Sequence, residues 1–326
     1  MTGAGVDPRW QRLRQGRSVV LGRVGMDLYA DPPGTKIEEA TRYVAAIGGS
    51  AGNIAVALVR QGTGAALVSR VSDDAVGRYC LAELARYGVD TAHVLTAGGE
   101  ARNSLAVVET RPVGAQTVLY RNGAADFALD EADVEAVDFT TAAALVVTGT
   151  ALARAPSRDA ALAAMRRARE GGAVVVLDVD HRAYSWASRE EAPRVCLGAA
   201  TSADVVIGND DEFGLLAGSH DRGEGLARDL AAHGALFTVY KRGHLGSVTY
   251  LRDGQFETGI FRVDALKPMG AGDGFMGGLL AGLAQGHGIE AAVRRGAATA
   301  AMIVAGIGCA PASPDTADLD AFIRRF

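Results

Sequence analysis

The sequence predicts an α/β protein with a doubly wound, mostly parallel sheet flanked by helices and a small β-sheet lid. First, 326 residues suffice for one large α/β domain with an appendage. Second, short runs rich in β-branched residues recur, each followed by a stretch with helical spacing. Third, most of these runs are apolar throughout, as in strands covered on both faces. We therefore expect a single domain over residues 1–326.

The expected strands of the large sheet lie, in chain order, at 18–22, 65–70, 144–148, 173–178, 204–208 and 236–240. Strand and helix alternating at this spacing imply parallel pairing through right-handed crossovers.

Two segments, at about 28–47 and 103–121, break this rhythm with alternating stretches and turn residues. We expect them to be inserted antiparallel hairpin strands that form the lid. An isolated hairpin is marginal in water, so the lid needs cover from a ligand cleft or a second subunit.

Composition narrows the classes of partner. The formal net charge is −5, which provides no general positive field for nucleic acid or an anionic membrane. Cys80, Cys196 and Cys309 lie far apart without C-x-x-C spacing, so we expect neither a disulfide framework nor a zinc site, and a cytoplasmic location. No run reaches the roughly 18 apolar residues that span a bilayer.

The most informative stretch is LKPMGAGDGF at 266–275, which leads into an apolar helix. Gly270 and Gly272, with Ala271 between them, allow backbone N–H groups to converge at a helix N-terminus, which favours an anion site. Asp273 could accept the proton of an attacking hydroxyl while the amides hold the charge on a transferring phosphoryl group. The alternative is a tight loop in which Asp273 is an ordinary N-cap.

A second glycine segment, with Gly48, Gly49 and Asn53, opens another apolar helix. Glycines allow close approach of a ligand, and Asn53 offers a donor and an acceptor to a polyol. An ordinary glycine-rich helix start is the alternative. The chain contains no G-x-x-x-x-G-K-[ST] loop, and the segment Gly22-Arg23-Val24-Gly25 after the first expected strand lacks the G-x-G-x-x-G spacing of a dinucleotide fingerprint. Both observations argue against P-loop enzymes and Rossmann dehydrogenases.

In order and separation, the strings GGSAGN (48–53) and GAGDGF (270–275) resemble the two signatures of the ribokinase family of carbohydrate kinases. The resemblance covers nearly the whole chain. It implies a ribokinase-like fold and an ATP-dependent sugar kinase that uses Mg²⁺, with Asp273 as catalytic base and the amides of 270–272 as anion hole.

The resemblance also implies further site residues. Those implied to hold the sugar are Asp27, Gly48, Gly49 and Asn53. Asn209 and Glu212 resemble the family's N-x-x-E element, in which Glu acts on Mg²⁺ through water. The turn implied to line the ATP phosphates contains Lys241, Gly243 and Gly246.

One position departs from the family. Most members carry an Asp six residues before the catalytic Asp, where it helps to hold a monovalent cation, and this chain has Lys267 there. Because an ammonium supplies the same charge, we expect Lys267 to replace that cation and the activity to need no potassium.

Further strings, among them GRVGMDLYAD and LDVDHRAYSW, resemble members that phosphorylate a keto-deoxy sugar acid. A planar guanidinium suits a carboxylate, which makes Arg121 and Arg182 candidates, with Asp178 and Asp180 as hydroxyl or arginine partners. A structural ion pair is the alternative for each arginine. Ala183 and Gly274 depart from those members and leave the general chemistry intact.

Three alternatives stay open. Within the family, the substrate could be 2-dehydro-3-deoxygluconate or fructose. Outside catalysis, a sugar-sensing protein could use the same scaffold, although it would be expected to lose Asp273 or the anion-hole glycines. On periodicity alone, a dehydrogenase also fits. Lid strands of the family often pair across a two-fold axis, so we expect a homodimer.

Overall fold

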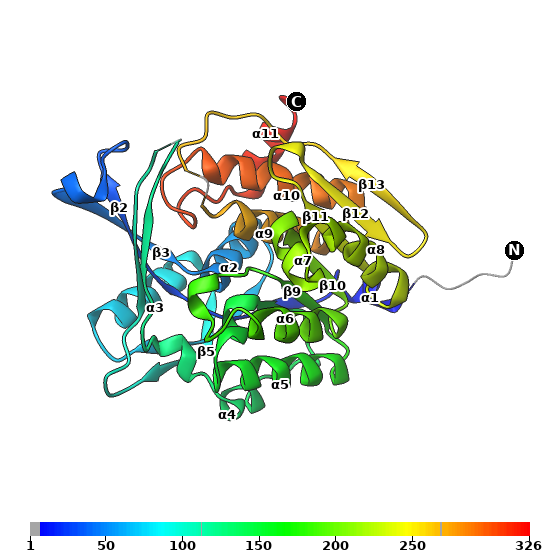
Figure 1. Cartoon of the computed structure of the whole chain (residues 1–326), viewed down its shortest axis with the longest axis horizontal. Helices are drawn as coiled ribbons and strands as arrows, with labels where there is room; N and C mark the ends of the chain where they lie inside the picture. The colour runs from blue at the N-terminus through cyan, green and yellow to red at the C-terminus, as the bar shows by residue number, and fades with distance from the viewer. Residues whose placement is uncertain (1–6, 112, 268) are drawn as a thin grey trace, which may run out of the picture.

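A nine-stranded sheet forms the centre of the molecule in the computed structural model, which describes residues 7–111, 113–267 and 269–326 (Figure 1). The strand order is β13-β12-β11-β10-β9-β8-β1-β4-β5. The bounds are β1 (Arg17–Leu21), β4 (Ala65–Ser72), β5 (Asp90–Ala97), β8 (Ala142–Thr148), β9 (Val174–Asp178), β10 (Val205–Asn209), β11 (Phe237–Lys241), β12 (Ser247–Leu251) and β13 (Gly254–Thr258).

The six strands expected from the sequence are confirmed, each within two residues at either end. They pair in parallel, as their uninterrupted apolar runs predict. Three further strands were not expected. Strand β5 extends one edge in parallel, and β12 and β13 extend the other as an antiparallel hairpin.

Helices cover both faces of this sheet. One face, which includes Val20 and Ile207, packs against α2 (Ser50–Arg60), α3 (Ala75–Tyr87), α9 (Ala271–Ala284) and α10 (Ile289–Val304). The opposite face packs against α4 (Glu131–Glu135), α5 (Ser157–Glu170), α6 (Glu191–Thr201), α7 (Asp210–Ala217) and α8 (Gly223–His233). Successive side chains of a strand enter opposite layers. Because helices cover both layers, the sheet is doubly wound.

The remaining elements are short. Helix α1 (Pro8–Arg12) stacks Trp10 on Phe237 with ring centroids 5.5 Å apart, and α11 (Thr316–Ile323) packs on α10 through Leu319. Short 3-10 helices lie at η1 (Ile37–Glu39), η2 (Ala125–Ala128), η3 (Gly149–Ala153), η4 (Ala183–Ser185), η5 (His220–Arg222) and η6 (Gly243–Leu245). Among the described helices, none combines the length and apolarity of a membrane crossing.

A second, four-stranded sheet projects from the body of the molecule (Figure 1). Its order is β3-β2-β6-β7, with bounds β2 (Gly25–Asp31), β3 (Arg42–Gly48), β6 (Ser104–Val108) and β7 (Thr117–Tyr120).

These strands lie in the two segments that interrupt the α/β rhythm, although β2 begins at Gly25, ahead of the expected start near 28. The expected antiparallel hairpins are confirmed for β2 with β3 and for β6 with β7, and a parallel pairing of β2 with β6, which was not expected, joins them. The chain returns through α2, β4, α3 and β5 between them, so no tight turn joins the two hairpins. Pro112 in the second segment and Pro268 in the glycine motif lie outside the described residues.

Candidate active site

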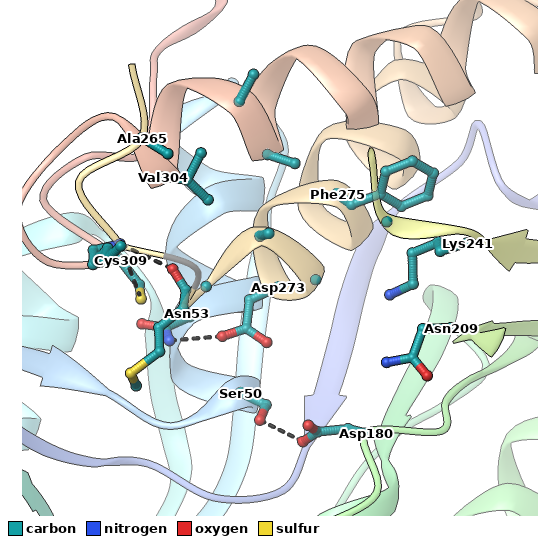
Figure 2. A pocket seen from close by; sticks show the side chains of 18 of the residues that line it. Ser50, Asn53, Asp180, Asn209, Lys241, Ala265, Asp273, Phe275, Val304 and Cys309 are labelled. Atoms are coloured by element: carbon teal, nitrogen blue, oxygen red, sulfur yellow. Dashed lines mark hydrogen bonds between the residues drawn. The ribbon is translucent and has the colours of Figure 1, made fainter. Parts of the chain in front are cut away.

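A cavity of about 1190 Å³ lies between the two sheets. Asp178, Asn209 and Lys241 reach it from the carboxyl ends of β9, β10 and β11, while Asp27 and Ala106 line it from the small sheet. Ligands of open α/β sheets bind at the carboxyl ends of the strands, so this is the expected place for a site. Figure 2 shows the side chains that converge there.

The glycine motif forms the N-terminus of α9. Gly270 has φ +81°, and a Cβ there would clash with Cys309 Sγ, so only glycine fits. The first-turn N–H groups, from Ala271 to Asp273, have no intrahelical acceptor by helix geometry and stand at the positive end of the helix dipole. This arrangement can hold the negative charge of a phosphoryl group.

Asp273 stands in that first turn and lines the cavity. Asn53 Nδ2 of helix α2 donates a hydrogen bond to Asp273 Oδ2 at 2.8 Å (Figure 2). Desolvation raises the pKa of Asp273 to about 6, and the nearby negative charge of Asp180 adds to the rise, while the Asn53 hydrogen bond opposes it. The result is a carboxylate at neutral pH that still has appreciable proton affinity.

The sugar-binding residues expected from the sequence gather around Asp27. Asp27 is 3% exposed, and its carboxylate accepts a hydrogen bond from Tyr29 OH at 3.1 Å. A Cβ on Gly48 would clash with the Asp27 carboxylate, so Gly48 packs behind that group, whereas Gly49 lines the cavity. Asn53 Oδ1 is buried and has no hydrogen-bond partner in the described chain, which leaves an acceptor for a ligand hydroxyl.

The two arginines expected to bind a carboxylate have different surroundings. Arg182 lines the cavity and forms an ion pair with Asp180 at 2.8 Å. Arg121 does not line the cavity: it forms a buried ion pair with Asp126 and its guanidinium lies over Phe127. For Arg121, the geometry therefore fits the structural ion pair.

Asp180 is anchored from the opposite wall, since Ser50 Oγ donates to its Oδ2 (Figure 2). Its neighbour Asp178 is buried at the end of β9. Burial raises the pKa of Asp178 well above its ordinary value, while the Lys241 ammonium opposes the rise.

The N-x-x-E residues form a capping box at the start of α7. Asn209 Oδ1 accepts from the Glu212 N–H at 2.8 Å, and Glu212 Oε2 accepts from the Asn209 N–H at 2.8 Å. The other Glu212 oxygen accepts from the His181 N–H at 3.1 Å. Both side chains line the cavity, and the carboxylate retains lone pairs for water around a cation.

The turn after β11 lies beside the glycine motif. A Cβ on Gly272 would be 3.5 Å from Lys241 Nζ, which places this ammonium next to the α9 N-terminus. Gly243 and Gly246 have φ +56° and +86°, and a Cβ on Gly246 would clash with the Thr258 carbonyl oxygen. Lys241, Gly243 and Gly246 all line the cavity.

Lys267 is 1% exposed. Its Nζ donates to the carbonyl oxygens of Met269 and Ile303 at 2.9 and 3.1 Å and lies 3.9 Å from Cys309 Sγ. Burial raises the pKa of Cys309 to about 12, so the thiol is neutral. In the described chain no carboxylate lies within salt-bridge distance of Nζ, so dipoles hold this buried cation.

Sequence reasoning missed an apolar group at one end of the cavity. Its members come from the segment after β13 and from one stripe of α10: Ile260, Phe261, Val263, Ala265, Ala297, Ala300, Ala301 and Val304. The helical spacing 297, 300, 301, 304 was the available signal. Sequence reasoning also missed Arg23 and Ser50, although Ser50 lies inside the string GGSAGN and Arg23 inside the string GRVGMDLYAD, both of which it singled out.

Comparisons with known proteins find relatives that match most of the chain. The family model described as "pfkB family carbohydrate kinase" matches residues 15–316. A protein of Photobacterium profundum named 5-dehydro-2-deoxygluconokinase is 39% identical over 313 residues, covering 94% of each chain. One of the same name from Geobacillus kaustophilus is 34% identical over 312 residues, covering 94% of this chain and 93% of the relative.

Two solved structures have a similar fold. A PfkB protein from Polaromonas superposes with TM-score 0.81 and 30% identity, covering 94% of this chain and 99% of that chain. A double mutant of fructokinase from Vibrio cholerae, in its fructose-, ADP- and potassium-bound form, superposes with TM-score 0.83 and 26% identity, covering 95% and 99%.

Proposed function

The chain belongs to the pfkB family of carbohydrate kinases, and on this basis we propose that its substrate is a keto-deoxy sugar acid, 5-dehydro-2-deoxy-D-gluconate, phosphorylated at the primary hydroxyl. The chain is an ATP-dependent sugar kinase. The name shared by its curated relatives supports the substrate, and the breakdown of myo-inositol is the pathway we propose. The product would be the 6-phosphate of the sugar acid, with ADP.

One observation carries the mechanism. Asp273 stands between the side chain of Asn53, on the sugar side of the cavity, and the first-turn amides of α9 on the other side. In our proposal Asp273 accepts the proton of the primary hydroxyl, which attacks the γ-phosphorus in line. The amides and Lys241 hold the charge that develops on the transferring group.

The sugar would lie against Asp27, Gly49 and Asn53. The buried carboxylate of Asp27 would accept hydrogen bonds from sugar hydroxyls. Asn53 Oδ1, which has no partner in the described chain, would accept another. Correct placement of the primary hydroxyl next to Asp273 supplies much of the rate by removing the entropy cost of encounter.

The nucleotide would lie along the rest of the cavity, with its base against the apolar group of α10 and its phosphates along Gly243 to Gly246. Mg²⁺, when bound, neutralises phosphate oxygens. Glu212 and Asn209 offer it oxygen donors, and because both Glu212 oxygens already accept backbone hydrogen bonds, we propose that Glu212 acts through water.

We also propose that Lys267 takes the place of the monovalent cation found in potassium-bound relatives. The support is its cage of carbonyl oxygens, which are the ligands potassium itself prefers. A cytoplasmic location and a homodimer complete the proposal. Three buried free thiols fit a reducing compartment, and an apolar outer face of the small sheet fits a second subunit.

The test measures ADP release with Mg·ATP and five acceptors: 5-dehydro-2-deoxygluconate, 2-dehydro-3-deoxygluconate, fructose, ribose and adenosine. We expect the highest kcat/KM for the first. A preference for 2-dehydro-3-deoxygluconate or fructose would keep the kinase and its base but replace the substrate.

The same assay tests the base. Asp273→Asn should lower kcat on the order of 10³-fold, because the proton loses its acceptor, while ATP affinity changes little. Asp253→Asn, in the exposed turn between β12 and β13, is the matched control and should leave kcat unchanged. Full activity of Asp273→Asn would refute the assignment.

A further inference from the structure

The proposed substrate is an anion, and the cavity that receives it is already rich in negative charge. Its carboxylates are Asp27, Asp178, Asp180, Glu212 and Asp273. A sugar carboxylate placed among them would be repelled unless a basic side chain faced it. The arginine and lysine side chains that line the cavity are Arg23, Arg182, Lys241, Arg262 and Lys267.

Four of these five cations are either bound to other groups of the chain or lie away from the sugar end of the cavity. Arg182 is paired with Asp180, and Lys267 is held in its cage of carbonyl oxygens. Lys241 lies beside Gly272 at the phosphate end. Arg262 is exposed next to the apolar group at the nucleotide end. The sugar end is left with Arg23.

Arg23 comes shortly after the end of β1, and hydrogen bonds of its backbone and of its side chain hold it in place. Its carbonyl oxygen accepts the Gly52 N–H at 3.3 Å, which ties it to the first turn of α2. Its Nη1 donates to Ser104 Oγ of the small sheet at 2.9 Å. A Cβ on Gly25 would lie 3.2 Å from Nη1, so that glycine leaves room for the guanidinium.

The guanidinium still has donors to offer. In the described chain no carboxylate lies within salt-bridge distance of it, and its buried Nε has no hydrogen-bond partner. Its charge nevertheless reaches the site: it opposes the rise that burial causes in the pKa of Asp27 and of Asp273. A half-buried arginine with unused donors, near two sugar-site carboxylates, is suited to a third carboxylate supplied by a ligand.

We propose that Arg23 binds the carboxylate of the sugar acid and so selects acidic over neutral sugars. This inference rests on the proposed function, and it assigns to Arg23 the role that the sequence suggested for Arg121 and Arg182. The charge-assisted hydrogen bonds offset the repulsion by Asp27, and the bond to Ser104 couples the same guanidinium to the small sheet.

The experiment compares kcat/KM for 5-dehydro-2-deoxygluconate and for fructose, a neutral ketose, in the wild type and three variants. Arg23→Gln removes the charge, and Arg23→Lys keeps the charge but loses the planar guanidinium. Arg102→Gln is the matched control, because it removes the charge of an exposed arginine. The KM for ATP is measured in each variant to show that the nucleotide half of the site is folded.

We expect Arg23→Gln to lower the ratio of acid to neutral kcat/KM on the order of 100-fold, mainly through the KM of the acid. Arg23→Lys should fall between this variant and the wild type, and Arg102→Gln should match the wild type. A ratio that stays within about threefold in Arg23→Gln would overturn the role of Arg23 while leaving the substrate in place. A wild type that prefers the neutral sugar would overturn both the sugar-acid substrate and Arg23, but not the kinase.

Discussion

At the scale of single residues, Asp273 shows how surroundings tune a common side chain for proton transfer. Its pKa is raised to about 6 by desolvation and by Asp180, against the hydrogen bond from Asn53. A base whose pKa lies near the working pH is ionised often enough to act and basic enough to take a proton. An exposed aspartate would be ionised but a much weaker base.

The pH dependence of kcat/KM tests this balance. Because Asp273 must be ionised, activity should be present above pH 6 and fall about tenfold per unit below it. Asn53→Ala removes the hydrogen bond that favours the charged form, so its acidic limb should move to higher pH. A wild-type profile that stays flat down to pH 5 would contradict the assignment.

Residue types were easier to predict than their partners. Asp273, Gly270 and Gly272 could be proposed from sequence because helix-start geometry fixes where their groups point. The roles of the arginines could not, because the fold pairs Arg121 with the carboxylate of Asp126, whereas in the described chain Arg23 contacts the Ser104 hydroxyl and has no carboxylate partner. Pairing of long side chains depends on tertiary contacts that no local pattern encodes.

At the scale of elements, the N-terminus of α9 and the C-terminus of α10 form one unit around Lys267. Nζ bonds the Met269 carbonyl before α9 and the Ile303 carbonyl near the end of α10. The lysine therefore fixes the loop that presents the anion-hole amides, and its charge adds to theirs.

Potassium dependence tests that unit. At constant ionic strength, replacing sodium with potassium should change wild-type kcat by less than about twofold, because the ammonium already occupies the cage. Lys267→Ala should lose at least about tenfold in kcat, and methylammonium should restore part of it. Several-fold activation of the wild type by potassium would contradict the replacement.

The same scale shows which elements a sequence reveals. The buried parallel strands were predictable, since their apolar runs have few alternative structures. Strand β5 and the hairpin β12–β13 mix polar and apolar residues at the sheet edges, so their pattern resembles that of loops. The parallel pairing of β2 with β6 joins segments far apart in sequence, and local periodicity carries no information about it.

At the scale of the whole molecule, the small sheet has two different faces. Ala106, Thr117 and Leu119 line the cavity, whereas the alternate residues of β6 and β7 face the other way. Val118 and Tyr120 on that outer face are 40% and 61% exposed. An open apolar face on a thin sheet is the observation that supports the proposed second copy.

The oligomeric state tests this proposed pairing, and it connects assembly with catalysis. Tyr120→Asp should convert a dimer into a monomer in sedimentation velocity, because a charge on the outer face would be buried in the interface. Leu95→Asp, an exposed apolar position on β5 at 42%, is the matched control and should leave the dimer intact. Since the small sheet also holds Asp27 and Ser104, the monomer should show a higher KM for the sugar at unchanged ATP affinity. A wild type that sediments as a monomer would contradict the dimer and leave the outer face to solvent.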